Sequence, residues 1–343
     1  MTKAIALYSG GLDSTLAILV AMRQGIEVTA VTFLTHFGCD ISDRSSCSKD
    51  PFSAAQKFGF EVKLCHLSDK FIEIVKHPRF GHGKNMNPCI DCRILMLKEA
   101  KALMAMRGAD VLITGEVLGQ RPMSQRRDTF PRIDREAGVQ GLVLRPLSAK
   151  LLKPTLAEEQ GLVDRELLYA FNGRSRKPQM ALAAELGLTE YPAPAGGCLL
   201  TDPIYSYRLR ELLRRNPSPA LNDIHLLRVG RHFRVNDATT VVVGRKQEEN
   251  EAIQGLAGGD DVLLWVEGCG SPLTLVRGES GPEAVRMAAC LCARYSDAKA
   301  RESVPVTVST KGERVSIEVP PASEQFIEEH MIKPAPHKGG VCR

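Results

Sequence analysis

The first residues that could do chemistry form a six-residue string, Ser-Gly-Gly-Leu-Asp-Ser, at positions 9–14. It follows the apolar run Ala4–Tyr8 and precedes a helix-forming segment. Adjacent glycines let backbone N–H groups approach phosphate oxygens closely, and a helix N-terminus adds its positive end. Hydroxyls and a carboxylate could hold a polyphosphate and its Mg²⁺ ion. The expected phosphate-binding residues here are Ser9, Gly10, Gly11, Asp13 and Ser14, with Mg²⁺ at Asp13.

Three cysteines form the second group of reactive residues. Cys89 and Cys92 stand in Asn-Pro-Cys-Ile-Asp-Cys-Arg, residues 87–93, and Cys198 follows two glycines much later in the chain. The chain has 10 cysteines, and in a reducing compartment they would not form structural disulfides. Cysteines of this kind are buried thiols, metal or cluster ligands, or nucleophiles.

The glycine loop resembles the phosphate loop of the N-type ATP pyrophosphatases, whose pattern is Ser-Gly-Gly-x-Asp-Ser. It contains no Gly-Lys-Ser/Thr, so transfer of the γ-phosphate is not indicated. The resemblance implies that ATP is cleaved between its α and β phosphates. AMP is then attached to a carbonyl oxygen, which makes that oxygen a good leaving group.

The cysteines and one further segment resemble the tRNA thiolases of this superfamily. Proline- and glycine-rich residues 191–198 end in Gly-Gly-Cys, and with the Pro-Cys-x-x-Cys element they match the tRNA 2-thiouridylases in kind. Residues 114–120, Thr-Gly-Glu-Val-Leu-Gly-Gln, resemble a segment of the tRNA 4-thiouridine synthetases. This resemblance covers residues 1–205 and implies that Gly115 contacts the nucleotide. It also implies catalytic roles for Asp13, Cys89, Cys92 and Cys198.

Two mechanisms fit these cysteines. In the first, Cys89, Cys92 and Cys198 bind three irons of a [4Fe–4S] cluster, and the open fourth iron carries the sulfide. In the second, Cys198 carries a persulfide, and Cys89 or Cys92 attacks it to release sulfur. Three cysteines rather than two favour the cluster.

Other cysteines offer further interpretations. A structural zinc bound by Cys39, Cys47, Cys89 and Cys92 is the weaker alternative, since the chain lacks a second Cys-x-x-Cys. Cys342 could act as a flexible sulfur carrier, although an exposed tail thiol is the simpler interpretation.

The second half of the chain indicates an RNA partner. Residues 233–250 resemble the start of an NFACT-R domain, a module of RNA- and ribosome-associated proteins. Between Arg174 and Arg234 there are 10 Lys and Arg against five Asp and Glu, so this stretch holds the whole net charge of +5. A basic band suits the phosphates of a polyanion.

Strands alternating with helices must position these residues. Apolar and β-branched runs predict five strands at Ala4–Tyr8, Val28–Leu34, Val62–Leu67, Asp110–Thr114 and Leu142–Leu144. Helices are expected between them, and also at Leu156–Leu168 and Pro178–Leu186. This alternation predicts an α/β fold with a doubly wound parallel sheet, and ligands bind at the carboxyl ends of such strands.

A second, smaller α+β domain is expected after the connector. Strands are predicted at residues 233–235, Thr239–Val243 and Val262–Val266, with a hairpin at Pro305–Val319 that turns at Lys311-Gly312. The expected domains are residues 1–205 (ATP pyrophosphatase and thiolase), 206–285 (NFACT-R-like, RNA contact) and 286–343 (hairpin, helix and mobile tail).

Composition and motifs together predict the function. No apolar run is long enough to span a membrane, and a cytoplasmic location is expected. We expect an ATP-dependent tRNA uridine sulfurtransferase that uses ATP, Mg²⁺ and a [4Fe–4S] cluster. Its partners would be tRNA and either a sulfur donor protein or inorganic sulfide, and a homodimer is left open. The alternatives are sulfur or nitrogen insertion into a small molecule, and a non-catalytic RNA- or ribosome-binding protein.

Overall fold

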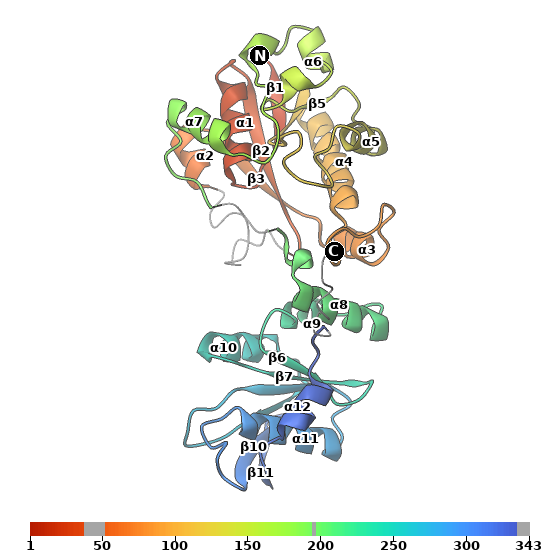
Figure 1. Ribbon diagram of the computed structural model, residues 1–343, viewed down its shortest axis with the longest axis vertical. Coiled ribbons are helices and arrows are strands. Elements are labelled where there is room, and N and C mark those ends of the chain that lie inside the picture. The colour runs from red at the N-terminus through yellow and green to blue at the C-terminus, as the bar shows by residue number, and fades with distance from the viewer. Residues whose placement is uncertain (38–51, 194–196, 335–343) are drawn as a thin grey trace, which may run out of the picture. The chain divides into compact units, whose positions relative to one another are not determined.

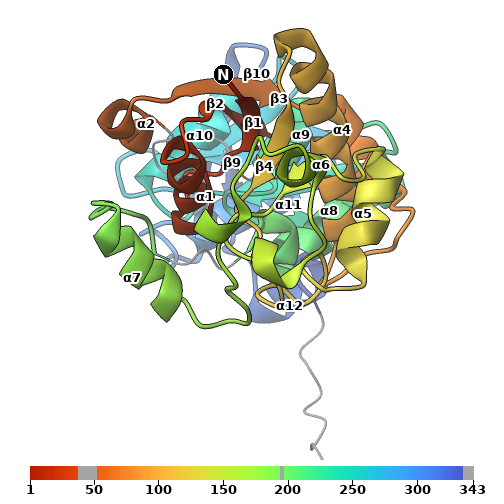
Figure 2. The same ribbon diagram turned by 90° about the horizontal axis from the view of Figure 1, so that it is seen from above.

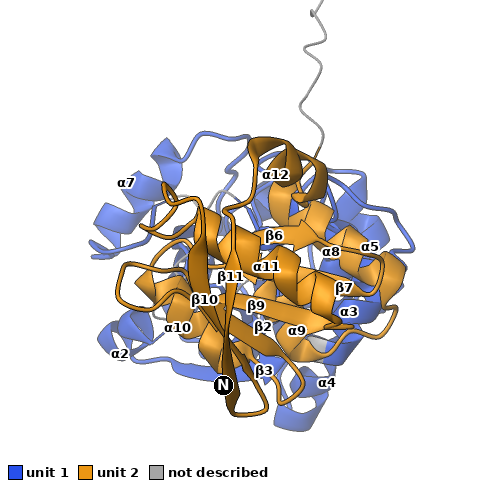
Figure 3. Ribbon diagram, turned by 90° about the horizontal axis from the view of Figure 1, so that it is seen from below, with its two compact units in different colours: residues 1–201 blue, residues 202–343 orange. Residues whose placement is uncertain are grey.

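The computed structural model describes residues 1–37, 52–193 and 197–334. The chain divides into two compact units, residues 1–201 and residues 202–343, which Figure 3 colours separately. Each unit has its own sheet and its own apolar core. No helix in these described stretches is both long and apolar enough to cross a membrane.

The first unit contains a five-stranded parallel sheet in the order β3-β2-β1-β4-β5. Its strands are β1 (Lys3–Leu7), β2 (Glu27–Leu34), β3 (Glu61–His66), β4 (Val111–Thr114) and β5 (Val143–Leu144). All five strands predicted from sequence are present, each within a residue or two of its expected bounds. The predicted doubly wound α/β fold is therefore confirmed.

Helices cover both faces of this sheet (Figure 1). On one face, the apolar helix α1 (Leu12–Met22) packs against α7 (Lys177–Glu185), and α2 (Ser53–Phe58) links β2 to β3. On the other, α4 (Cys89–Arg107) packs against α3 (Ser68–Lys76) and α5 (Thr129–Ala137). Figure 2 shows α1 and α4 on opposite sides of the strands. Because these helices run back from the carboxyl ends, the N-termini of α1 and α4 lie at the same edge of the sheet.

The predicted helix at Leu156–Leu168 is wrong. The structure has only α6 (Leu156–Glu159) there, with short 3₁₀ turns at Ala149–Leu151 and Arg165–Leu167. Thr155 begins α6 with a capping box to Glu158, and Gly161 adopts a φ of 69°, which ends the helical path. A further 3₁₀ turn, Leu199–Thr201, closes the first unit.

The second unit begins with two helices, α8 (Pro203–Arg215) and α9 (Leu221–Leu226). A six-stranded antiparallel sheet follows in the order β11-β10-β8-β9-β7-β6. Its strands are β6 (Arg231–Arg234), β7 (Thr239–Val243), β8 (Val262–Trp265), β9 (Thr274–Gly278), β10 (Val304–Thr310) and β11 (Glu313–Val319). The predicted hairpin is present, with Lys311 and Gly312 both at positive φ in its turn.

Helix α11 (Pro282–Arg294) covers one face of this sheet with buried alanines, and the smaller cluster around Val242 and Leu275 packs under α10 (Gln247–Leu256) on the other. Helix α12 (Glu324–His330) ends beside β6. Strand β10 pairs with β8, so residues 286–343 contribute two strands to the same sheet as residues 206–285.

Candidate active site

The Ser-Gly-Gly-Leu-Asp-Ser loop lies at the carboxyl end of β1 and leads directly into α1, as predicted. Its two serines hold the loop closed. Ser14 Oγ donates to the Gly11 carbonyl at 3.0 Å and accepts from the Ser9 backbone N–H at 3.3 Å. Gly10 has a φ of 69°, a conformation that few other residues adopt. The loop is thus a preformed turn at a helix N-terminus, the geometry that suits an anion.

Asp13 carries the feature that fits a cation. Its Oδ2 accepts from Gln120 Nε2 at 3.0 Å, while Oδ1 is buried and has no hydrogen-bond partner. Burial raises the pKa of Asp13, against the opposing effects of Gln120, Arg176 and Arg121. A buried carboxylate oxygen without a donor suits Mg²⁺, which prefers oxygen ligands. The residues present therefore fit the predicted Mg²⁺ and polyphosphate.

Gly115 packs against the phosphate loop at the end of β4. A Cβ at this position would lie 2.5 Å from Ser14 N and 2.6 Å from the carbonyl carbon of Asp13. These neighbours are backbone atoms, so they could not move aside as a side chain would. Gly115 is required for this close approach, and its contact with the nucleotide stays a prediction.

Cys89 and Cys92 lie in the first turn of α4, also at the carboxyl edge of the sheet. Cys89 Sγ donates to Ser124 Oγ at 3.4 Å. Asp91, between the two cysteines, is buried, and its carboxylate accepts from the backbone N–H groups of Arg79 and Phe80, each at 3.1 Å. Asp91 therefore fixes the preceding loop.

A buried ionic network ties the cysteine helix to the strand beside the phosphate loop. Arg93, next to Cys92, places Nε 3.0 Å from Glu116, and Arg145 reaches the same carboxylate at 3.1 Å. Arg145 also binds Asp134 at 2.7 Å. Burial acts to raise the pKa of Glu116, but Arg93 and Arg145 outweigh it and hold the pKa below its usual range. The network fixes α4 against the segment that follows Gly115.

The segment that carries Cys198 docks onto the loop that precedes Cys89. Met86 N–H donates to the Leu200 carbonyl at 3.1 Å, and Asn85 Nδ2 donates to the Thr201 carbonyl at 2.7 Å. Leu199 N–H donates to the Phe37 carbonyl at 3.1 Å. Cys198 is far from Cys89 and Cys92 in the sequence, and these contacts bring it to the same end of the first unit.

The three cysteines do not form a metal-holding group in this geometry. Among residues 1–37, 52–193 and 197–334, no three Cys, His, Asp or Glu side chains are arranged to hold a metal ion. The [4Fe–4S] cluster stays a prediction, and no step is derived through it. Cys39, Cys47 and Cys342, which the zinc and sulfur-carrier interpretations need, fall outside the described residues.

The loop of residues 119–125, here called the bridging loop, contacts both halves of the site. Gln120 binds Asp13, and Ser124 binds Cys89. Four residues span at most about 14 Å, so the phosphate loop and the cysteine helix lie near each other at this edge of the sheet. Sequence reasoning quoted Gln120 only as part of a motif and did not identify Arg121, Ser124 or Arg176. These residues can be recognised as part of the site only from contacts between segments that are far apart in the sequence.

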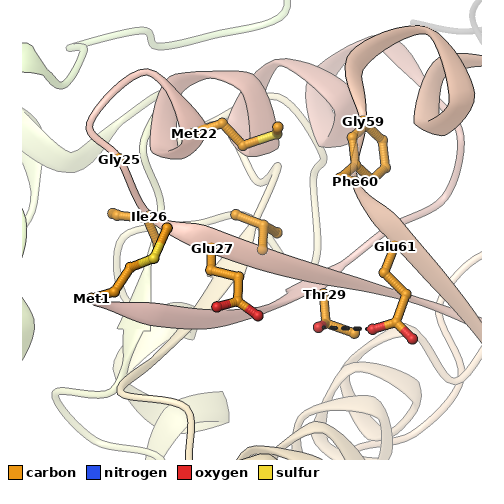
Figure 4. Close-up of a pocket in the computed structure, with 10 residues that line it drawn as sticks. Met1, Met22, Gly25, Ile26, Glu27, Thr29, Gly59, Phe60 and Glu61 are labelled. Atoms are coloured by element: carbon orange, nitrogen blue, oxygen red, sulfur yellow. Dashed lines mark hydrogen bonds between the residues drawn. The ribbon is translucent and has the colours of Figure 1, made fainter.

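A cavity lies elsewhere in the first unit. It has a volume of about 400 Å³ and sits where β1, β2 and β3 begin, at the amino ends of the strands (Figure 4). Met1, Met22 and Phe60 line it together with two acids, Glu27 and Glu61. Glu61 accepts from Thr29 and is paired with Lys63 and Arg107. Ligands of doubly wound sheets bind at the opposite edge, so this cavity is not the nucleotide site.

Comparison with known families agrees with this division of the chain. Residues 1–151 match the family model described as thiamine biosynthesis protein (ThiI), and residues 230–331 match the NFACT protein RNA binding domain. The chain therefore resembles a ThiI-type domain in residues 1–151 and an NFACT RNA-binding domain in residues 230–331. The NFACT match runs beyond residue 285 and includes β10 and β11, so it extends the resemblance expected from sequence.

The chain is also similar to proteins whose names describe tRNA modification. It is 30% identical over 132 residues to the tRNA-specific 2-thiouridylase MnmA of Methylobacterium nodulans, covering 35% of this chain and 34% of that protein. It is 35% identical over 123 residues to the probable tRNA sulfurtransferase of Thermoanaerobacter pseudethanolicus, covering 34% of this chain and 30% of that protein. The chain thus spans about a third of the length of these curated relatives.

Among solved structures, a 4-thiouridine synthetase in complex with RNA and ATP is 20% identical, with a TM-score of 0.35. The match covers 55% of this chain and 52% of that chain. The likeness is too distant to support an argument about residues.

Proposed function

We propose that this chain is an ATP-dependent tRNA uridine sulfurtransferase. The observation that carries the proposal is the bridging loop, which contacts the acid of the phosphate loop through Gln120 and the thiol of Cys89 through Ser124. An ATP-activating loop and a sulfur nucleophile that lie near each other suit a reaction in which an adenylated oxygen is replaced by sulfur. The thiolase relatives support the same reaction.

The activation step uses the phosphate loop. ATP binds with its polyphosphate on the Gly10–Gly11 turn and the N-terminus of α1, and Asp13 holds Mg²⁺. A uridine carbonyl oxygen attacks the α-phosphorus, the bond to the β-phosphate breaks, and pyrophosphate leaves. Arg121 and Arg176, whose charges act on Asp13, supply positive potential for the departing pyrophosphate.

The sulfur step uses the three cysteines. The sulfur comes from one of two sources. A sulfur donor protein that carries a persulfide passes its outer sulfur to the Cys198 thiolate and keeps a thiolate itself, whereas inorganic sulfide, which cannot form a persulfide without an oxidant, would supply only the cluster route. In the persulfide route, a thiolate of the Cys89/Cys92 pair attacks the inner sulfur of a persulfide on Cys198. A disulfide forms and hydrosulfide leaves; hydrosulfide then adds to the base carbon and AMP departs. A dithiol reductant restores the cysteines. A [4Fe–4S] cluster on Cys89, Cys92 and Cys198 is the alternative way to hold the sulfur.

The second unit provides the RNA contact. Residues 230–331 match an RNA-binding domain, and the basic stretch from Arg174 to Arg234 leads into it. The proposed partner is tRNA, and the proposed location is the cytoplasm. A first domain of residues 1–205 and a homodimer belong to the same proposal.

The test is pyrophosphate release with and without tRNA, followed by nucleoside analysis of the tRNA. We expect pyrophosphate to form in proportion to tRNA and thiouridine to appear when sulfide or a sulfur donor is supplied. Equal pyrophosphate release without tRNA would instead indicate a small-molecule substrate. An absorption band near about 400 nm after anaerobic purification would support the cluster, and a colourless active protein would support the persulfide route.

A further inference from the structure

Ser124 stands out because it contacts a proposed sulfur-handling thiol and matches none of the motifs. Its side chain is 2% exposed, and its Oγ accepts from Cys89 Sγ at 3.4 Å. A buried hydroxyl requires a partner, and Cys89 is the partner that its Oγ has in the described structure. The contact joins two segments that are far apart in sequence.

The bridging loop holds Ser124 rigidly in this place. Gly119 N–H donates to the Gln125 carbonyl at 2.7 Å, which closes the loop around residues 120–124. Gln120 anchors it to Asp13, and Met123 packs so tightly on Gly83 that a Cβ there would lie 2.0 Å from its sulfur. The hydroxyl therefore cannot follow Cys89 if the thiol rotates, and it selects one direction for the Cys89 side chain.

From this geometry we propose that Ser124 is a positioning residue for the sulfur-transfer step, which it serves by holding Cys89 Sγ in one direction through their hydrogen bond. The inference rests on the proposed function for the meaning of that step. In the described residues the bridging loop is bonded to Asp13 through Gln120 and not through Ser124, so we expect adenylation to proceed without the Ser124 hydroxyl. Displacement of a reacting group by about 1 Å can cost about 100-fold in rate.

The two half-reactions separate this role from a general structural one. In Ser124→Ala we expect thiouridine formation to fall about 10-fold in kcat, with KM for ATP and tRNA-dependent pyrophosphate release unchanged. Ser124→Thr keeps the hydroxyl and should recover most of the rate. A loss of both half-reactions in Ser124→Ala, without recovery in Ser124→Thr, would mean that Ser124 serves only the fold.

A second measurement does not depend on activity. Released from Ser124, the Cys89 thiol can turn from its buried neighbour toward solvent, so iodoacetamide should modify it faster in ligand-free Ser124→Ala. Peptide mass spectrometry gives the ratio of Cys89 to Cys92 modification, which we expect to rise at least about threefold. An unchanged ratio would overturn the proposal.

A matched control exists in the second unit, where Ser271 Oγ lies 3.9 Å from Cys292 Sγ. Ser271→Ala should leave both half-reactions and the Cys89 to Cys92 ratio as in the wild type. Failure of the proposed function would show differently, since the wild type itself would release no tRNA-dependent pyrophosphate. The modification ratio would still report on Ser124 in that case.

Discussion

At the scale of single residues, Asp13 serves the proposed function and lowers the stability of the ligand-free protein. The side chain is held mostly out of water with one oxygen unpartnered, and burial raises its pKa above the ordinary value of 3.8. An ionised carboxylate in this state is destabilising unless a cation binds it. Asp13 therefore makes the ligand-free protein less stable than its packing alone would allow.

Asp13→Asn should stabilise the ligand-free protein and abolish pyrophosphate release. The raised pKa means that Asp13 contributes stability below pH 3.8, which is lost as the pH rises through its folded-state pKa. The melting temperature of Asp13→Asn should thus exceed that of the wild type by roughly 2–4 °C at neutral pH, with the difference vanishing in acid. Calorimetry from pH 3 to 7 without Mg²⁺ measures it. A variant that is less stable at neutral pH would contradict the burial argument.

Gly115 offers a second residue-scale prediction. In Gly115→Ala the new Cβ would collide with backbone atoms of Asp13 and Ser14, so the phosphate loop must shift. We expect ATP affinity to fall at least about tenfold, which corresponds to about 1.4 kcal/mol. Gly255→Ala is the control, since Gly255 lies in α10 with open space around its Cα. Titration calorimetry with ATP distinguishes them, and equal affinities would contradict the steric account.

At the scale of elements, a short docking contact decides whether Cys198 belongs to the site. Asn85 has a φ of 59°, and its side chain holds the Thr201 carbonyl. Asn85→Gly keeps the backbone conformation and loses the hydrogen bond, whereas Asn85→Ala loses the bond and adds strain of about 1 kcal/mol. Iodoacetamide should therefore modify Cys198 faster in Asn85→Gly than in the wild type, and fastest in Asn85→Ala.

Cys65, half-buried in β3, serves as the internal standard for these rates. The Cys198 to Cys65 ratio would stay at its wild-type value if the docking contact were unimportant.

Most of the helices and strands were predictable from the sequence, because the local pattern of apolar and polar residues decides where they form. Val28–Leu34 is rich in apolar and β-branched residues, as a strand inside a parallel sheet is expected to be, and the structure has β2 there. The segment at Leu156–Leu168 misled because its composition favours a helix while Gly161 and the turn at Asp164 interrupt it. Strand β9 was not predicted from the sequence, because its five residues become a strand through pairing with β7, which lies far away in the sequence.

The candidate site was predictable in its glycine loop and cysteines and not in what connects them. Ser9–Ser14 and Cys89–Cys92 are contiguous patterns with a local chemical meaning. Ser124 and Arg176 gain meaning only when the fold brings them to Cys89 and Asp13. Side chains that act through partners distant in sequence leave no periodic signal.

At the scale of the whole molecule, two units with separate cores suggest separable tasks. A fragment of residues 1–201 should bind ATP as the full chain does and lose tRNA affinity at least about tenfold. The remaining tRNA binding should also depend less steeply on salt, since fewer phosphates are neutralised. Filter binding between about 50 and 200 mM salt measures both quantities. Undiminished tRNA affinity in the fragment would place the RNA contact within the first unit.

The bridging loop has a consequence for how such chains can diverge. Gln120 and Ser124 each have one required partner, and the backbone bond between Gly119 and Gln125 closes the loop around them. One residue added or removed between positions 120 and 124 would break one of the two contacts whatever its identity. Descendants of this chain can therefore exchange the intervening residues Arg121, Pro122 and Met123 more readily than they can change their number. The number of residues in the bridging loop is therefore more tightly constrained than the identity of the residues within it.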